Sequence, residues 1–152
     1  MIPPYIYSDK ATYGVLPPGV HEASLSEIEE RFAITAHRMS LFRGIVAVAI
    51  NLKDAGCTML YLDGSYVTEK EIPSDFDGCW EPKGVIARML DPVLLNFENK
   101  RAAQKAKYGG ELFPSSWPAT QIGDKTFFQF FQQNKETGEP KGLIGLRLDT
   151  MT

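Results

Sequence analysis

Apolar positions recur along the chain with two different periods, which predict helices alternating with short strands. From about Ala36 to Ala55 they return mostly every three or four residues, as on the buried face of a helix, and Gly56 is a suitable helix stop. Ser24 and Glu27 form a capping-box pattern ahead of a short helix from about Leu25 to Phe32. We expect the longer helix to cover a sheet.

The strand candidates are short apolar runs bounded by turn residues. In chain order they are residues 58–62, 76–80, 111–113 and 142–148. A further helix is expected to begin at the Asp91-Pro92 pair, where Asp91 is a capping carboxylate, and to persist through about Lys107. Gly109-Gly110 should end it. The predicted fold is therefore α/β (α+β), with a short mixed sheet covered by helices.

Length and composition favour one globular domain over residues 1–152, in which residues 1–20, rich in Pro, Gly and Tyr, form an extended N-terminal arm. No apolar run has the roughly 18 residues of a membrane helix, so we expect no membrane partner. The start of the chain lacks a secretory pattern, which favours the cytoplasm, with Cys57 and Cys79 reduced and buried. A net charge of −3 argues against general DNA binding but permits a local phosphate site.

Candidate chemistry lies between the first two strand candidates. Gly64-Ser65 ends the first, and Asp75-Phe76-Asp77 opens the second after nine intervening residues. Carboxylates two apart on a strand point to one face at a spacing of roughly 7 Å, so both can reach a divalent cation. A Gly-Ser turn brings backbone amides and a hydroxyl close to phosphate. Taken singly, each element is also typical of an ordinary surface turn.

The order of strand, Gly-Ser and Asp-apolar-Asp resembles the active-site arrangement of the polymerase-β-like nucleotidyltransferase superfamily. The resemblance to a small bacterial nucleotidyltransferase-like family extends along the chain through the segments 16–21, 63–68, 73–77, 127–129 and 141–144. It implies the nucleotidyltransferase fold and metal-dependent transfer of NMP from an NTP to an acceptor, which is RNA, a protein or a small molecule. Relatives in the wider superfamily include toxin and antitoxin components.

The resemblance also implies a third carboxylate from a later strand, for which Glu111 is the candidate. It replaces the more usual aspartate, and its alternative role is that of a solvated strand-edge residue. Asp75, Asp77 and Glu111 would hold Mg²⁺, as one ion or two, with Mn²⁺ able to substitute. Gly64 and Ser65 would contact the triphosphate.

Positive charge should meet the triphosphate, and Lys70 and Arg101 are our choice among several cations that also include Lys105, Lys107 and Lys141. The alternative for each is a solvated surface charge.

Several other polar and aromatic residues favour structural roles. We expect Asp63 to cap the following turn, His21 to make a local hydrogen bond and His37 to have a structural role. The aromatic run Phe127–Phe131 favours a core position, with base stacking as the alternative. The main functional alternative to an enzyme is a catalytically silent nucleotidyltransferase-like protein with a binding or regulatory role, and a plain structural domain is a third.

Overall fold

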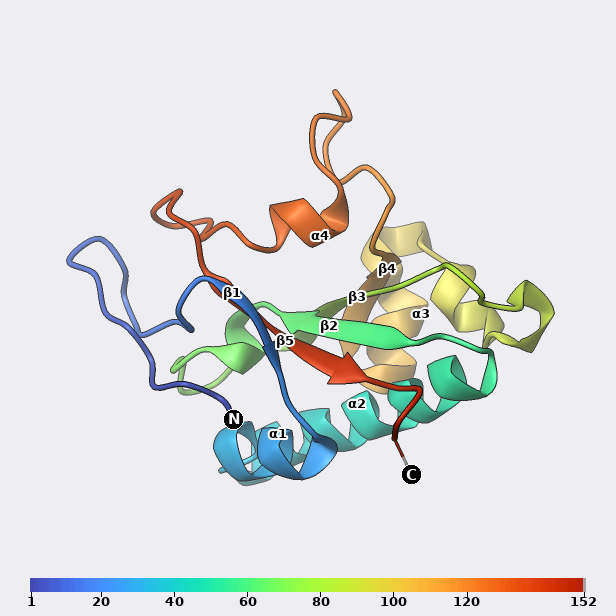
Figure 1. Ribbon diagram of the computed structural model, residues 1–152, viewed down its shortest axis with the longest axis horizontal. Coiled ribbons are helices and arrows are strands. Elements are labelled where there is room, and N and C mark those ends of the chain that lie inside the picture. The colour runs from blue at the N-terminus through green and yellow to red at the C-terminus, as the bar shows by residue number, and fades with distance from the viewer. Residues whose placement is uncertain (152) are drawn as a thin grey trace.

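One open five-stranded sheet organises the chain in the computed structural model, which describes residues 1–151 (Figure 1). The strands are β1 (Gly19–Glu22), β2 (Met59–Asp63), β3 (Phe76–Trp80), β4 (Gly110–Pro114) and β5 (Gly142–Arg147). Their spatial order is β1-β5-β2-β3-β4. The β1/β5 and β3/β4 pairs are parallel, whereas β2 runs antiparallel to both β5 and β3. The mixed α/β class expected from the sequence is confirmed.

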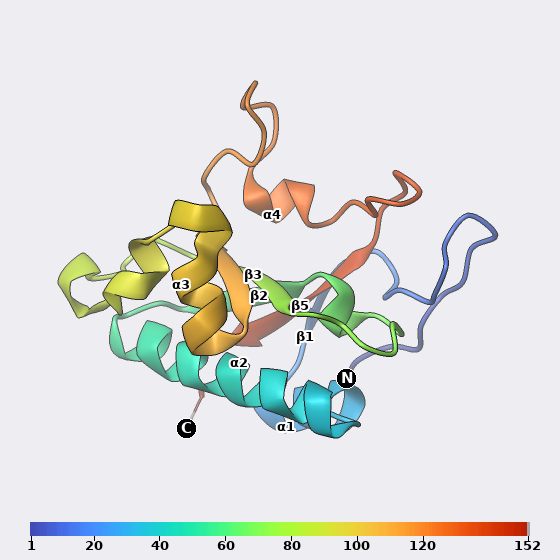
Figure 2. The same cartoon turned by 180° about the vertical axis from the view of Figure 1, so that it is seen from behind.

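The helices divide between the two faces of this sheet. They are α1 (Leu25–Phe32), α2 (Ala36–Asp54), α3 (Glu98–Tyr108) and the single turn α4 (Phe127–Phe130), joined by the 3-10 turns η1 (Ser65–Val67), η2 (Ala87–Met89) and η3 (Pro92–Leu95). Helices α1 and α2 lie across one face, and α4 lies on the other (Figures 1 and 2). The capping box of α1 is confirmed, because Ser24 and Glu27 each bond the backbone of the other at 3.1 Å.

Strand alternation explains this division. On β3, Phe76 and Trp80 are buried in the main core together with apolar residues of α1 and α2, whereas Cys79 joins a smaller cluster with Phe131. Asp77 lies between Phe76 and Gly78 and therefore shares the face of Cys79. The α4 face of the sheet consequently carries the polar residues of β3.

Helix α3 packs against α2 through a close backbone approach. A Cβ added to Gly44 in α2 would lie 1.7 Å from the carbonyl oxygen of Tyr108, so a side chain there would push the helices apart. Beyond Tyr108, Gly109 takes the left-handed conformation (φ 83°) and ends α3, as the sequence predicts. Chain direction then reverses into β4.

The predicted helix from Asp91 to Lys107 is wrong in one respect, since it is not continuous. Asp91 does cap η3 by accepting a hydrogen bond from the Val93 amide at 3.0 Å, but the chain leaves the helical path at Asn96 and α3 starts only at Glu98. Between them, Phe97 stacks on Phe113 of β4 with ring centroids 5.8 Å apart. This tertiary contact outweighs local helix propensity.

The N-terminal arm is a returning loop that leads into the sheet. Ile6 and Val15 pair through two backbone hydrogen bonds of 2.8 and 3.0 Å, and residues 19–20 already belong to β1. Among residues 1–151, no helix combines the length and apolar character needed to cross a membrane.

Candidate functional site

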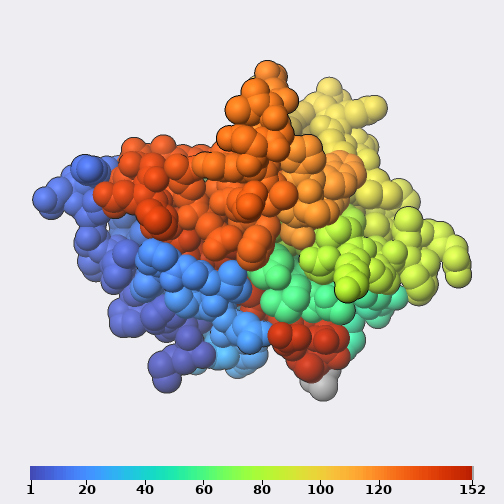
Figure 3. Space-filling model, turned by 45° about the horizontal axis from the view of Figure 1, so that its top comes forward, coloured from blue at the N-terminus to red at the C-terminus, as the bar shows by residue number. Residues whose placement is uncertain are grey.

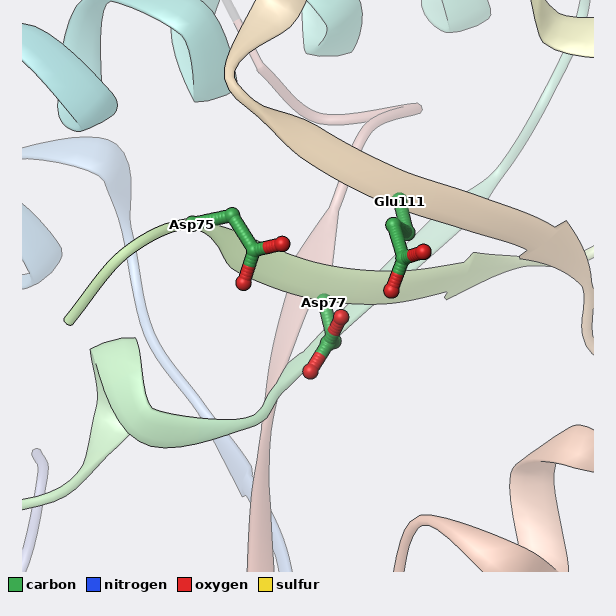
Figure 4. A group of neighbouring side chains, drawn as sticks. All are labelled: Asp75, Asp77 and Glu111. Carbon is green, nitrogen blue, oxygen red and sulfur yellow. The ribbon is translucent and has the colours of Figure 1, made fainter. Parts of the chain in front are cut away.

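Three carboxylates converge at the rim of the sheet. Asp77 on β3 is the register partner of Glu111 on β4, and Asp75 directly precedes β3. One carboxylate oxygen from each lies within 4.8 Å of the others, and the side chains point into a common space (Figure 4). The structure therefore brings together the three residues that the sequence and the resemblance selected.

Mutual repulsion and burial raise proton affinity in this cluster. Burial, followed by the charges of Asp75, Asp63 and Glu111, raises the pKa of Asp77 to about 7. Burial and the charge of Glu111 raise the pKa of Asp75 as well. Among residues 1–151, the two aspartates have no cation within ion-pairing distance, and like charges held this close cost free energy that a bound cation would offset.

Glu111 differs from the two aspartates because two cations already balance it. Arg101 donates from Nε and Nη2 to one carboxylate oxygen at 2.9 and 2.7 Å, and Lys105 lies 3.3 Å from the same oxygen. Burial alone would raise the pKa of Glu111, but the hydrogen bonds and charges of Arg101 and Lys105 lower it overall. Three consecutive left-handed residues, Asn99 to Arg101, form the first turn of α3 that carries Arg101.

The Gly-Ser turn lies directly against the aspartates. Gly64 has φ 78°, and a Cβ built on it would lie 2.3 Å from Oδ2 of Asp77. Glycine is therefore required both by conformation and by space. Ser65 then opens η1, and its carbonyl accepts hydrogen bonds from the Thr68 amide and hydroxyl at 3.1 and 2.7 Å. The turn is thus held by its own short-range bonds.

A cavity of about 420 Å³ opens beside the turn and reaches Asp77. Its walls come from three separate parts of the chain: the N-terminal arm, the Gly-Ser turn and the segment before β5. The lining residues are Tyr13, Val15, Asp63, Gly64, Ser65, Thr68, Asp77, Asn134, Lys135, Glu136 and Lys141. This volume lies in the range of small-molecule sites, about 300 to 1,000 Å³.

Asp63 and Lys141 form a buried ion pair in the cavity wall. Burial raises the pKa of Asp63, although the charge and hydrogen bond of Lys141 act in the opposite direction. Asp63 is also the register partner of Asp77, so acidic residues lie side by side on β2, β3 and β4. The sequence predicts a turn cap at Asp63 and does not reveal its pairing with a lysine 78 residues away.

The two cations chosen from the sequence, Lys70 and Arg101, do not line the cavity. Lys70 is exposed in the loop before β3, and Arg101 is bound to Glu111. Lys135 and Lys141 line the cavity instead, and the charge of Lys135 lowers the pKa of both Asp75 and Asp77. Lys135 has no signal in the sequence, because only the fold brings its loop over the turn.

A buried arginine fixes the segment that follows the turn. Arg38 of α2 is only 3% exposed, and its guanidinium donates to backbone carbonyls of Phe32, Tyr66, Thr68 and Lys70 at 2.6 to 3.2 Å. Three of these carbonyls belong to residues 66–70, directly after Ser65. Arg38 therefore anchors the Gly-Ser turn to α2. The sequence pattern does not predict this role, because arginine is also common at exposed positions of a helix.

The remaining candidates have structural roles. His21 bonds the carbonyl of Pro17 at 2.7 Å, as local hydrogen bonding predicts, and His37 bonds the carbonyl of Pro73, 36 residues away, at 2.5 Å. Both cysteines are free and buried, and burial raises the pKa of the Cys57 thiol to about 11. Phe131 is buried and Phe127 stacks on Phe113 with centroids 4.0 Å apart, so packing accounts for this part of the aromatic run.

Fold and site together define a mixed α/β protein with an acidic cluster beside a glycine turn. The chain belongs to the family of unknown function DUF6932, which matches residues 9–147. No curated protein and no solved structure matches it. The matched range contains the carboxylates, the turn and the cavity lining, so the functional argument rests on their geometry.

Proposed function

We propose that the protein is a metal-dependent nucleotidyltransferase that transfers NMP from an NTP to a hydroxyl of an acceptor and releases pyrophosphate. The acceptor is RNA, a protein or a small molecule. The observation that carries the proposal is the contact between two parts. Asp75, Asp77 and Glu111 gather within 4.8 Å, and the Gly64 turn lies directly against Asp77 at the mouth of a cavity. The carboxylates that bind the metal must lie next to the turn that binds the phosphates, because the metal ion has to contact phosphate oxygens of the NTP.

The topology agrees with the polymerase-β-like nucleotidyltransferase fold that the resemblance implies. Gly64 and Ser65 follow β2, the aspartates lie at the start of its antiparallel neighbour β3, and Glu111 lies on the next strand. Five strands of mixed direction, with the long helices α1 and α2 together on one face, support the same proposal.

The donor set suits Mg²⁺, with Mn²⁺ as a substitute, because hard divalent cations prefer carboxylate oxygens. Bound at Asp75, Asp77 and Glu111, as one ion or two, the metal would neutralise phosphate charge and favour the attacking alkoxide. The resemblance to the nucleotidyltransferase superfamily suggested this metal. The charge balance of the cluster supports it, since the two aspartates share no cation at hydrogen-bonding distance among residues 1–151.

The chain's own residues position the nucleotide. Gly64 leaves its backbone open to phosphate oxygens, Ser65 offers a hydroxyl, and Lys135 and Lys141 bring positive charge to the same cavity. Lys70 and Arg101 remain proposed nucleotide ligands. The charge of Lys70 already acts on Asp75, and Arg101 would reach phosphate only after leaving Glu111. Arg38 keeps the turn in place.

The ion pairs of Glu111 favour a second candidate, a catalytically silent protein that binds nucleotide as a regulator or as one part of a toxin and antitoxin pair. With Arg101 and Lys105 bound to its carboxylate, Glu111 would have to exchange partners before it could bind metal. Either candidate works where NTP, Mg²⁺ and reduced thiols are found, which agrees with the cytoplasm.

Label transfer tests the proposal and separates these candidates. Wild-type protein and the Asp75→Asn/Asp77→Asn double variant are incubated with each α-labelled NTP, Mg²⁺ and a cell lysate. Label on RNA, protein or a small molecule with wild type only is the predicted result. NTP binding without any transfer would favour the silent regulator, and equal transfer by both proteins would contradict the assigned site.

A further inference from the structure

The N-terminal arm contributes an aromatic side chain to the cavity beside the turn. Tyr13 is half-buried and is the one aromatic residue among those that line this cavity within residues 1–151. Within the same residues, its ring stacks on no other aromatic ring, in contrast to the interlocked phenylalanines around Phe113. An aromatic ring that lines a polar cavity and stacks on no other aromatic ring suits a flat ligand.

Two sets of contacts hold the arm where it is. At its base, the Ile6 and Val15 backbones pair, Gly14 accepts a hydrogen bond from the Glu69 amide at 3.0 Å, and Tyr7 donates to the Glu69 carboxylate at 2.7 Å. Glu69 follows η1 closely, so the arm is fastened to the same loop as the Gly-Ser turn.

At its far side, the arm is clasped to the segment before β5. The Thr12 amide and hydroxyl donate to the two carboxylate oxygens of Glu136 at 2.5 and 2.9 Å. Figure 3 shows the arm, in blue, lying directly against the orange-red C-terminal segment. Glu136 is itself fixed, because its amide donates to Asn134 Oδ1 at 2.9 Å. This clasp holds the chain next to Tyr13, which lines the same cavity as Ser65.

We propose that Tyr13 is the stacking platform for the nucleobase of the bound NTP and that the Thr12–Glu136 clasp holds the platform in place. The proposal rests on the proposed function and deepens it. The cavity is lined by Gly64, Ser65 and Lys141, which suit phosphates, and by Tyr13, which suits a flat ring. A ligand with a charged end and a flat aromatic end matches both. Stacking accepts every base, and we expect purine nucleotides to bind more tightly than pyrimidine nucleotides.

The test measures the contribution of the base to binding separately from that of the phosphates. Isothermal titration with ATP and with inorganic triphosphate, each with Mg²⁺, is carried out on wild type, Tyr13→Ala and Tyr13→Phe. Tyr13→Ala should weaken ATP binding about tenfold to a hundredfold and leave triphosphate binding unchanged, because stacking energy is lost and phosphate contacts are kept. Tyr13→Phe keeps the ring and should bind ATP within about threefold of wild type.

The clasp is tested in the same way. Thr12→Val removes the hydroxyl half of the clasp at a residue outside the cavity lining, and it should weaken ATP binding without affecting triphosphate binding. Glu139→Ala, whose carboxylate lies 3.9 Å from Lys10 of the arm, should change neither. Unchanged ATP affinity in Tyr13→Ala, or equal loss of ATP and triphosphate binding, would overturn the platform and leave the proposed function standing. Wild-type protein that binds neither ligand would overturn both.

Discussion

Replacing Asp77 with asparagine should stabilise the metal-free protein at alkaline pH. The aspartate has a pKa of about 7 in the folded protein, chiefly because of burial and the charges of Asp75, Asp63 and Glu111. An aspartate in an unfolded chain has a pKa of about 3.9. Between these values the folded protein holds the proton more tightly, so stability falls as pH rises from about 4 to about 7 and then levels off.

The magnitude follows from the same two values. Each tenfold difference in proton affinity corresponds to about 1.4 kcal/mol, so the ionised Asp77 costs about 4 kcal/mol above pH 7. Asparagine cannot recover the whole of this free energy, because its side-chain amide needs hydrogen-bond partners in the confined space beside Gly64. We therefore expect Asp77→Asn to raise the free energy of unfolding by about 2 kcal/mol at pH 8 and by much less at pH 5.

Urea unfolding followed by circular dichroism, in the presence of EDTA at pH 5 and pH 8, measures this difference. Asp9→Asn, at an exposed position of the arm, is the matched control and should change stability little at either pH. If Asp77→Asn gains no more stability over wild type at pH 8 than at pH 5, the carboxylates do not repel one another as described.

Three further sets of variants test the supporting structure. Gly64→Ala should destabilise the fold by about 3 kcal/mol and abolish NTP binding. Gly123→Ala is the control, because Gly123 also has a positive φ (70°) but no atom lies within 4 Å of the added Cβ, and it should cost about 1 kcal/mol. Equal costs in thermal melts would contradict the close approach of Gly64 to Asp77. Arg38→Met should cost about 3 kcal/mol in urea and loosen residues 66–70 in hydrogen exchange, and unchanged protection would refute the anchor. Asp63→Leu and Lys141→Met should each lower the free energy of unfolding by about 3 kcal/mol, because each leaves a buried charge without its partner. The double variant should cost less than either single variant, and additive losses would argue against the Asp63–Lys141 ion pair.

Local patterns in the sequence predict the elements whose stability is local. Helix α1 has its own capping box, α2 its own periodicity, and β3 is bounded by polar turn residues, so all three lie within about one residue of the predicted bounds. The break before α3 could not be predicted this way. At this break Phe97 stacks on Phe113 of β4. The two residues lie 16 positions apart on either side of α3, so no local pattern connects them.

The site residues likewise divide into those that the sequence predicts and those that only the structure reveals. Asp75 and Asp77 follow from their spacing, and Glu111 entered through the family resemblance. The cavity walls come from the arm and from Asn134 to Lys141, and no spacing rule connects segments more than 120 residues apart. The sequence therefore supplies the carboxylates, the turn and Lys141 as one of several candidate cations, and the fold adds Tyr13 and Lys135.

Magnesium-dependent NTP binding tests the central claim most directly. Titration of wild type and the Asp75→Asn/Asp77→Asn double variant with each NTP, with Mg²⁺ and with EDTA, requires no knowledge of the acceptor. We predict binding by wild type that depends on Mg²⁺ and is lost in the double variant, although that variant stays folded. Binding of equal strength in both proteins, or none in wild type, would contradict the assignment of the cluster as the metal site of a nucleotide pocket.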